Sequence, residues 1–382
     1  MAFYGTDGED VVTNNAQTEF YLGAGNDAFG IPTAASLVFG GTGSDGLSGG
    51  PLSDQFYGDP GNDLLIGVNG GLVETSGTGL TATSPRVFTG SSPSGVDLLS
   101  GGAGIDVLWS FDGNDRLYGG EGNDSGVVRI GPIRGFTVYW QAGLFGGAGK
   151  DFLDGGAGDD WLDGGLGSDR MLGGDGDDIF VVNGPTDVVV EGDDGGNDTV
   201  LAMTRYTLRA GVEVEDLQSY SASSTVDVAL IGNEIGQGIT GNAGDNVLRG
   251  LAGRDDLSGL AGNDFLDGGA NSDNLNGGAG KDSFIFSTAL LRTNVDRVGD
   301  FNHAQDTIRL DNAVFTGLSG GALPSSAFVL GTRATDPDDR IIYDRATGNL
   351  YFDADGTDGA AAVRFATIVN KAALDASDFF VV

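Results

Sequence analysis

The chain contains 382 residues, of which 70 are glycine, and its 55 acidic and 19 basic side chains give a formal net charge of −36 at pH 7. This glycine content, about 18 per cent against a usual share of roughly 7 per cent, predicts few long helices. Of the acids, 47 are Asp and only eight are Glu. Asp beside Gly is typical of tight turns and of oxygen ligands for hard cations, so the excess of Asp indicates a structural role rather than solubility alone.

Composition also excludes several classes of protein. The chain lacks the clustered Lys and Arg that bind nucleic-acid phosphates or anionic membranes, so neither is an expected partner. No apolar run is long enough to span a membrane, and Met1 to Gly5 offers no signal-peptide pattern for the general export route. The absence of Cys excludes disulfides and thiol chemistry. Something else must hold this loop-rich chain together.

A nine-residue unit of the form G-G-x-G-x-D-x-U-x, with U large and apolar, recurs along the chain. Sixteen copies form four blocks, which begin at residues 40, 49 and 58; at 92, 101, 110 and 119; at 146, 155, 164 and 173; and at 241, 250, 259, 268 and 277. The eighth position is large and apolar in fifteen copies. A low-complexity Gly/Asp linker would not keep that position apolar, so the period indicates a stacked repeat fold.

In chain order, the pattern divides the sequence into blocks and spacers. We expect an N-terminal cap with degenerate repeats (1–39), repeat block 1 (40–66), a loop or insertion (67–91), blocks 2 and 3 (92–181) with a ligand-poor spacer at 128–145, a β spacer (182–231), block 4 (232–286) and a C-terminal β region (287–382).

The C-terminal region contains clear strand patterns. Arg340 to Asp344 and Asn349 to Asp353 are rich in aromatic and β-branched residues and predict a hairpin, with residues 345–348 as its turn. Val363 to Val369 predicts a further strand, and short strands are expected between residues 180 and 230.

The tandem unit resembles the hemolysin-type calcium-binding nonapeptide of the RTX family, proteins secreted by Gram-negative bacteria. The resemblance covers 144 residues, sixteen copies of nine. It implies an all-β fold, a parallel β-roll or right-handed β-solenoid, in which two units make one turn. Asp151 would then lie beside Asp169, and Asp160 beside Asp178. On the same geometry, residues 128–145 are expected to form one ligand-free turn of a continuous roll.

The sixth position is Asp in every copy except that of Asn246. These carboxylates are the candidate metal ligands: Asp45, Asp54, Asp63, Asp97, Asp106, Asp115, Asp124, Asp151, Asp160, Asp169, Asp178, Asp255, Asp264, Asp273 and Asp282. Stacked carboxylates repel by roughly 4 kcal/mol per pair at 4 Å and an effective dielectric of 20. A hard cation with six or more oxygen ligands reverses that repulsion, and Ca²⁺ fits a flexible oxygen site better than Mg²⁺. Pairing units within each block gives about eight ions or more, so folding and Ca²⁺ binding should be one equilibrium.

The end of the chain resembles another part of secreted proteins. Val298 to Phe301, the Arg340 to Asp353 hairpin and Phe365-Ala366 are similar to the C-terminal region of serralysin-type proteases. The last residues, Asp378 to Val382, are similar to the uncleaved signal of type I secretion. The resemblance implies passage, unfolded, through an ABC transporter into a calcium-rich exterior. A simple edge strand is the alternative for this chain end.

Catalytic motifs are weak. The zinc site of serralysins needs H-E-x-x-H, and His303 is the only His in the chain, so that protease is not encoded. The G-x-S-x-G matches at 46–50 and 317–321 are expected by chance in a chain so rich in Gly. Carboxylate pairs suited to glycoside chemistry are abundant, but the longest stretches without repeats are short for a catalytic domain.

The sequence therefore predicts a secreted or cell-surface, calcium-folded protein with a structural or adhesive role, or one in host or matrix interaction, and no enzymatic activity. Its expected partners are the type I secretion ABC transporter and an extracellular polysaccharide or host surface. The alternative is an extracellular polysaccharide-acting enzyme, a glycosidase, lyase or epimerase carried on RTX repeats.

Overall fold

A computed structural model describes residues 3–13, 19–30, 36–49, 52, 54–67, 96–110, 112–125, 127–133, 136–192, 195–357, 359 and 361–382. The chain forms two compact units, the N-terminal unit (Met1–Val200) and the C-terminal unit (Leu201–Val382). No described residue lies in an α-helix, so the expected all-β class is confirmed. Within the described part, no helix is long and apolar enough to cross a membrane. The loop predicted at 67–91 lies outside the described residues except for Gly67.

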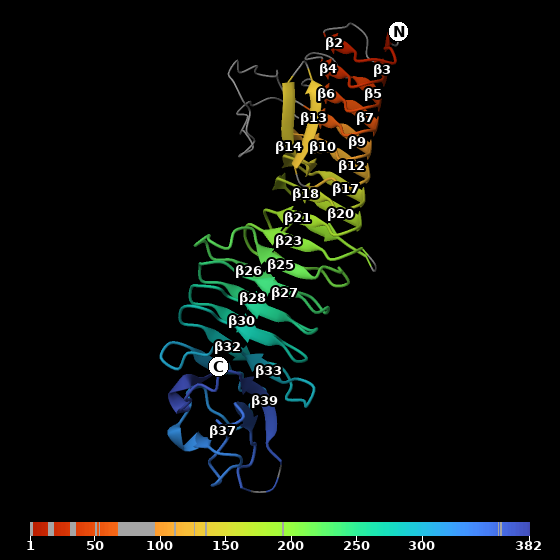
Figure 1. The fold of residues 1–382 in the computed structure, drawn as a ribbon. Coiled ribbons are helices and arrows are strands. Elements are labelled where there is room, and N and C mark those ends of the chain that lie inside the picture. Colours follow the sequence, from red (N-terminus) through yellow and green to blue (C-terminus); the bar gives the residue numbers. More distant parts are fainter. Residues whose placement is uncertain are drawn as a thin grey trace. The chain divides into compact units, whose positions relative to one another are not determined.

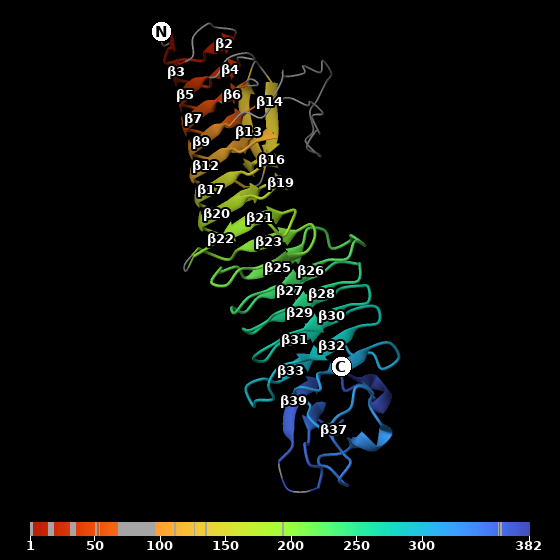
Figure 2. The ribbon, with the colours of Figure 1, turned by 180° about the vertical axis from the view of Figure 1, so that it is seen from behind.

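The N-terminal unit is a parallel β-roll with two main stacked sheets, whose strands lie side by side as rungs (Figure 1; Figure 2 shows the opposite side), and a small third parallel sheet of β11 (Asp112–Gly113), β16 (Ala148–Gly149) and β19 (Leu166–Gly167). One sheet contains, in order, β1 (Phe3–Tyr4), β3 (Glu19–Ala24), β5 (Leu37–Thr42), β7 (Gln55–Pro60), β9 (Leu98–Ala103), β12 (Arg116–Glu121), β17 (Phe152–Ala157), β20 (Arg170–Asp175) and β22 (Val188–Val190). The other contains β2 (Val11–Thr13), β4 (Ala28–Gly30), β6 (Gly46–Ser48), β8 (Leu64–Ile66), β10 (Val107–Trp109), β15 (Gly143–Phe145), β18 (Trp161–Asp163) and β21 (Ile179–Val182).

The eighth residue of each nine-residue repeat forms the core of the roll. Leu153 pairs in register with Met171, and Leu162 with Phe180, so one turn takes 18 residues, two nine-residue units. All four side chains are fully buried. Because neighbouring residues of a strand point to opposite faces, the period of nine keeps the apolar residue inside on every turn. The predicted register is therefore confirmed.

Two segments interrupt the 18-residue period without breaking the sheets. Phe56 lies opposite Leu99, 43 residues later, which is 25 more than an ordinary turn. Leu117 lies opposite Leu153, 36 residues later, which is 18 more. The strands on either side of both insertions pair in register, so blocks 1, 2 and 3 form one continuous stack.

The prediction that residues 128–145 form a turn of the roll is wrong. β13 (Val127–Ile133) and β14 (Phe136–Gln141) pair with each other as an antiparallel hairpin, while β10 pairs directly with β15. Only β15 within this segment belongs to the roll. Adjacent β-rich stretches can pair locally through a short connection, and this removes the segment from the parallel stack without changing its register.

Glycine at the fourth position is required by the close approach of successive turns. Gly158 has a φ of +121°, and a Cβ there would lie 2.1 Å from the carbonyl oxygen of Gly122 one turn earlier. At Gly149, a Cβ would lie 1.4 Å from the carbonyl oxygen of Gly113. Only Gly combines a positive φ with this contact.

The C-terminal unit also begins as a parallel roll. One sheet contains β25 (Asp216–Ser219), β27 (Gly238–Thr240), β29 (Asp256–Ser258), β31 (Asn274–Asn276), β33 (Asp296–Val298), β39 (Val363–Ile368), β38 (Asn349–Phe352), β37 (Ile341–Asp344) and β36 (Phe328–Leu330). The other contains β24 (Tyr206–Thr207), β26 (Ala229–Ile231), β28 (Val247–Arg249), β30 (Phe265–Asp267), β32 (Ser283–Phe286), β34 (Thr307–Leu310), β40 (Phe379–Val381) and β35 (Gly321–Ala322).

The last hundred residues close this roll with antiparallel strands. The predicted hairpin is confirmed, since β37 and β38 pair antiparallel, and β39 corresponds to the strand expected at 363–369. The chain end is not a free tail. β40 pairs with β34 on one side and β35 on the other, and Phe379 and Val381 are buried.

We predict that Gly158→Ala lowers the free energy of unfolding of the calcium-loaded protein by at least about 2 kcal/mol, because it adds both backbone strain and a clash with Gly122. The matched control is Gly184→Ala, whose added Cβ would meet only the Thr186 hydroxyl, at 4.0 Å, and which should change stability by less than about 0.5 kcal/mol. Urea denaturation followed by circular dichroism measures both. Equal effects of the two substitutions would contradict the stacking argument.

Candidate metal centre

The sixth-position aspartates form columns that run along the rolls. Asp151 shows the repeating contact: its backbone N–H donates to Oδ1 of Asp169 at 2.9 Å, one turn later. The same bond joins Asp160 to Asp178 at 2.8 Å. The two neighbour pairs predicted from the sequence are therefore adjacent. Each carboxylate thus uses one oxygen to hold the backbone of the preceding turn in place.

Two columns run through the N-terminal unit. One contains Asp54, Asp97, Asp115, Asp151, Asp169 and Asp187. The other contains Asp10, Asp27, Asp45, Asp63, Asp106, Asp124, Asp160, Asp178 and Asp198. Both continue across the insertions between blocks, so the columns are longer than the separate blocks suggested.

The C-terminal unit has two shorter columns. One begins at Gln237 and contains Asp255, Asp273 and Asp296, and the other begins at Asn246 and contains Asp264, Asp282 and Asp306. All fifteen residues predicted as ligands thus lie in columns, and each is at most 7% exposed. Whether they bind metal remains a prediction.

Several column members lie outside the predicted set, namely Asp10, Asp27, Asp187, Asp198, Asp296 and Asp306. Asp27 and Asp187 are 18 residues from Asp45 and Asp169, so extending the period beyond the blocks could have found them. Asp198, Asp296 and Asp306 follow their neighbours by 20, 23 and 24 residues. A fixed period gives no signal for them.

The second carboxylate oxygen of many column residues is buried without a hydrogen-bond partner. It is Oδ2 in Asp27, Asp45, Asp63, Asp151, Asp160, Asp169, Asp178, Asp255, Asp264, Asp273 and Asp282. A buried polar atom without a partner is costly, and most such atoms in proteins have one. Its repetition at equivalent positions indicates a shared ligand.

Backbone oxygens converge on the same places. A Cβ built on Gly155, at the first position of its unit, would lie 2.4 Å from Oδ2 of Asp160 and 2.7 Å from the carbonyl oxygen of Gly173. Gly58 faces Oδ2 of Asp63 and a carbonyl oxygen in the same way. First-position glycine therefore leaves space where carboxylate and carbonyl oxygens meet. Such a donor set, all oxygen and partly anionic, suits a hard cation such as Ca²⁺.

Burial raises the pKa of these carboxyl groups, and repulsion from neighbouring column residues adds to the effect. The pKa of Asp63 rises to about 9, with contributions from Asp106 and Asp45. The pKa rises to about 6 in Asp160, Asp264, Asp273 and Asp282, to about 7 in Asp45, Asp97, Asp106, Asp169 and Asp255, and to about 8 in Asp124, Asp151, Asp178 and Asp296.

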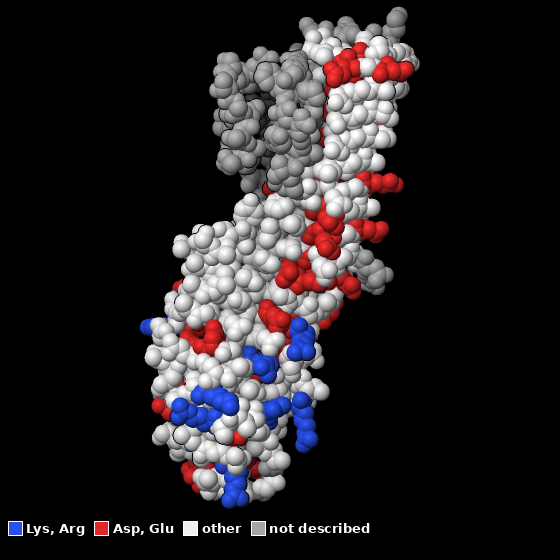
Figure 3. Space-filling model, in the orientation of Figure 1, with Lys and Arg blue, Asp and Glu red and all other residues white. Residues whose placement is uncertain are grey.

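Most of this charge is hidden from the surface. On the face shown in Figure 3, much of the described surface of the N-terminal unit is neither acidic nor basic. The column residues lie beneath it. A cation bound between turns would neutralise buried charge that solvent cannot screen.

Comparison with known proteins agrees with this chemistry. The family model of the RTX calcium-binding nonapeptide repeat matches residues 38–71, 94–125, 145–180, 239–266 and 249–284, which overlap all four blocks. The chain therefore carries RTX calcium-binding repeats.

One similar solved structure is the AlgE6R3 subunit of the Azotobacter vinelandii mannuronan C5-epimerase. It is 29% identical, with a TM-score of 0.26, over 38% of this chain and 78% of that one. A search of curated proteins gives no match. The resemblance of the C-terminal region to serralysins stays a prediction.

We predict that the metal-free protein loses stability as the pH rises. The folded carboxyls have pKa values of about 6 to 9, whereas unfolded Asp has about 3.9, so the folded state binds more protons between these values. Unfolding is then favoured as pH increases through this window. The melting temperature of demetallated protein should be at least about 10 °C lower at pH 8 than at pH 5.

Excess Ca²⁺ should reverse this slope, because the ion needs ionised ligands and protons compete with it. Thermal melts of the same preparation at both pH values, with and without Ca²⁺, test the sign. A melting temperature of the metal-free protein that rises from pH 5 to pH 8 would argue against buried, protonated columns.

Proposed function

We propose that this protein is a secreted RTX protein that folds when it binds Ca²⁺ outside the producing cell and then serves a structural, adhesive or matrix-binding role. The observation that carries the proposal is the row of buried Oδ2 atoms without partners along each Asp column. Their repetition on successive turns calls for a cation at each step rather than at one special site. The continuity of the columns across blocks supports eight ions or more.

Secretion before folding is consistent with this chemistry. In a calcium-poor cytosol, unneutralised carboxylates would disfavour the roll and keep the chain in the unfolded form that a type I ABC transporter passes. Asp378 to Val382 is the proposed export signal. Because β40 is an inner strand of its sheet in the folded protein, the transporter would read this segment before the sheet forms.

We predict that addition of Ca²⁺ to chelated protein produces a cooperative gain of β-rich circular dichroism and raises the melting temperature by at least about 10 °C, since binding to the folded state alone stabilises it. Mg²⁺ at the same concentration should have a much smaller effect, because it demands octahedral geometry and gives up water reluctantly. Identical spectra and melting points in EDTA and in millimolar Ca²⁺ would refute the proposed function.

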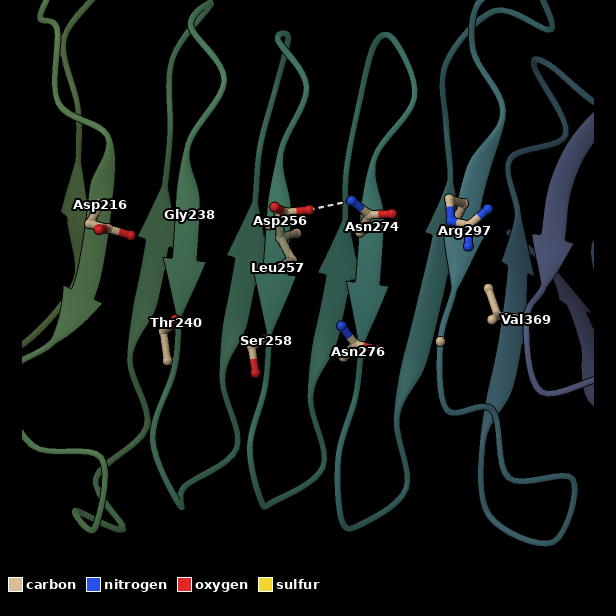
Figure 4. Close-up of a pocket in the computed structure, with 11 residues that line it drawn as sticks. Asp216, Gly238, Thr240, Asp256, Leu257, Ser258, Asn274, Asn276, Arg297 and Val369 are labelled. Atoms are coloured by element: carbon tan, nitrogen blue, oxygen red, sulfur yellow. Dashed lines mark hydrogen bonds between the residues drawn. The ribbon is translucent and has the colours of Figure 1, made fainter. Parts of the chain in front are cut away.

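A groove on the C-terminal unit favours a polysaccharide as the ligand of such a protein. It has a volume of about 610 Å³ and crosses β25, β27, β29, β31 and β33. Its lining residues project from neighbouring strands (Figure 4). Parallel strands are spaced about 4.8 Å apart, so polar groups recur along the groove at that interval.

Two polar rows line this groove. Asp216, Asp256, Asn274 and Arg297 form one row in strand register, interrupted by Gly238, and Thr240, Ser258 and Asn276 form the other. Repeated donors and acceptors suit an extended polymer rich in hydroxyl groups. No aromatic side chain is among the groove's lining residues. The absence of aromatic side chains from the lining favours binding of a polysaccharide over its enzymatic conversion.

The enzymatic alternative has one supporting observation. Asp216 and Asp256 lie on strands separated by β27, roughly 10 Å apart along the sheet, close to the ~6.5–9.5 Å between carboxyls in inverting glycosidases. A polysaccharide-acting enzyme is therefore the second candidate function.

We predict that Asn274→Ala combined with Arg297→Ala weakens binding to a responsive polysaccharide by about tenfold, through the loss of two polar contacts. Calcium-loaded protein would be tested against bacterial and plant polysaccharides by co-sedimentation. The control, Arg345→Ala, changes an exposed Arg in the hairpin turn outside the groove. New reducing ends or unsaturated products, lost in Asp256→Asn, would favour the enzyme, and unchanged binding by the double variant would exclude the groove.

A further inference from the structure

The last turn of the N-terminal roll contains a carboxylate cluster that departs from the repeat pattern. Asp178, Glu191 and Asp198 are all buried, and each offers an oxygen within 4.8 Å of the others. Asp178 is a repeat residue and Asp198 is its column neighbour. Glu191 has no counterpart in the nonapeptide unit, because it occupies the place of a first-position glycine.

The spacing along the chain and the hydrogen bonds of Glu191 establish that it occupies the first position of a repeat. Glu191 follows Gly173 by 18 residues, one full turn, and its Oε1 accepts the backbone N–H of Gly173 at 2.8 Å. The same oxygen accepts the N–H of Gly174 at 3.2 Å. The side chain therefore reaches back across the roll and covers the first two positions of the preceding turn.

Oε1 of Glu191 also takes the place of a backbone carbonyl oxygen found in the repeats. At Gly155, the space of the missing Cβ is shared by Oδ2 of Asp160 and the carbonyl oxygen of the glycine one turn later. At Gly173, the same space is shared by Oδ2 of Asp178, 2.1 Å from the built Cβ, and Oε1 of Glu191, 2.3 Å from it. A neutral carbonyl in the repeat is thus exchanged for an anionic oxygen at the end of the roll.

Backbone capping alone does not account for this side chain. Glu191 is only 6% exposed, and its Oε2 is buried with no hydrogen-bond partner, as is Oδ2 of Asp178. The C-terminal unit supplies a comparison. There Asp300 accepts the N–H groups of Gly277 and Gly278 with separate oxygens, at 3.0 and 2.8 Å. Asp300 uses both oxygens as a cap, whereas Glu191 uses one and directs the other into the acidic cluster.

We infer that Asp178, Glu191 and Asp198 form a divalent-cation site of the Ca²⁺ class that follows the last nine-residue repeat of the N-terminal unit and binds more tightly than the repeat sites. The inference rests on the proposed function, since the ion would be drawn from the same exterior. Three carboxylates in one site carry more charge than the two carboxylates and carbonyls between ordinary turns, and ligand charge is a main determinant of Ca²⁺ affinity. This ion would hold Glu191 and Asp198, which follow the last nine-residue repeat, against Asp178 within that repeat.

The test compares Glu191→Gln with the wild-type full-length chain. Gln retains a carbonyl oxygen that can accept both N–H groups, so the cap survives while the anionic ligand is lost. Protein would be dialysed against buffers of stepped free Ca²⁺, and bound calcium per chain measured by elemental analysis. We expect the wild type to retain one ion per chain at the lowest free Ca²⁺, and the variant to need about 10- to 100-fold more Ca²⁺ to bind it.

Two further variants make the test specific. Asp300→Asn removes the same charge from the matching cap of the C-terminal unit and should leave the tightest ion unchanged. Glu191→Gly restores the glycine of the repeat consensus and should lose that ion as Glu191→Gln does. Hydrogen exchange of Gly173 and Gly174 in saturating Ca²⁺ checks that Glu191→Gln still folds at this end.

The outcomes separate this inference from the proposed function. If the wild type binds no Ca²⁺, the proposed function fails. If the wild type binds Ca²⁺ and Glu191→Gln retains the tightest ion with unchanged affinity, Glu191 is an acidic cap only and the site is disproved. Loss of that ion in Asp300→Asn but not in Glu191→Gln would also overturn the assignment.

Discussion

The structure depends on the stacking of buried carboxylates at the spacing of β-strands. Neighbouring turns are about 4.8 Å apart, and ionised groups at 4 Å repel by roughly 4 kcal/mol at an effective dielectric of 20. One backbone N–H per turn donates to each column, as between Asp151 and Asp169. A single hydrogen bond contributes only about 1.5–3 kcal/mol when it involves a charged group. The columns therefore need protons or cations, and at neutral pH in a calcium-rich medium the cation is the available one.

The glycines follow from the same constraint. Carboxylate and carbonyl oxygens can converge at Gly155 only because no Cβ occupies the space, and turns can stack at Gly158 only because its backbone tolerates a positive φ. Larger side chains in these loops would stabilise an ordinary fold without metal, but here they would fill the space in which the oxygens converge. The loops therefore keep open the space that the proposed Ca²⁺ ions would occupy, instead of filling it with side chains.

The sequence period, read with the β-roll that the RTX resemblance implies, predicted the register of the roll, its buried eighth position and the pairing of Asp160 with Asp178, because each depends on a contact one repeat turn away. It did not predict the β13–β14 hairpin, since an insertion of 18 residues has the same length as a turn. Nor did it identify Asp198 or Asp306, which join their columns after irregular loops. The sequence did not single out Glu191 for another reason. Its proposed role depends on contacts with Gly173 and Asp178 in three dimensions, and no repeat pattern distinguishes it from the other acidic residues.

The ends of a stacked repeat require residues that its interior does not. Interior turns have neighbours on both sides, so stability there is a sum of equivalent interfaces, whereas a terminal turn loses one interface entirely. At the start of the N-terminal unit, Tyr4, Tyr21, Phe39 and Tyr57 stack in a ladder with ring centroids 4.9–5.2 Å apart, which adds apolar contact where the repeats are degenerate. At its other end, Glu191 adds charge beside Asp178 instead of apolar surface. The aromatic ladder adds packing that does not involve a cation, although the Asp27, Asp45 and Asp63 column runs through the same turns. The contribution of Glu191 at the other end, by contrast, would depend on the proposed ion.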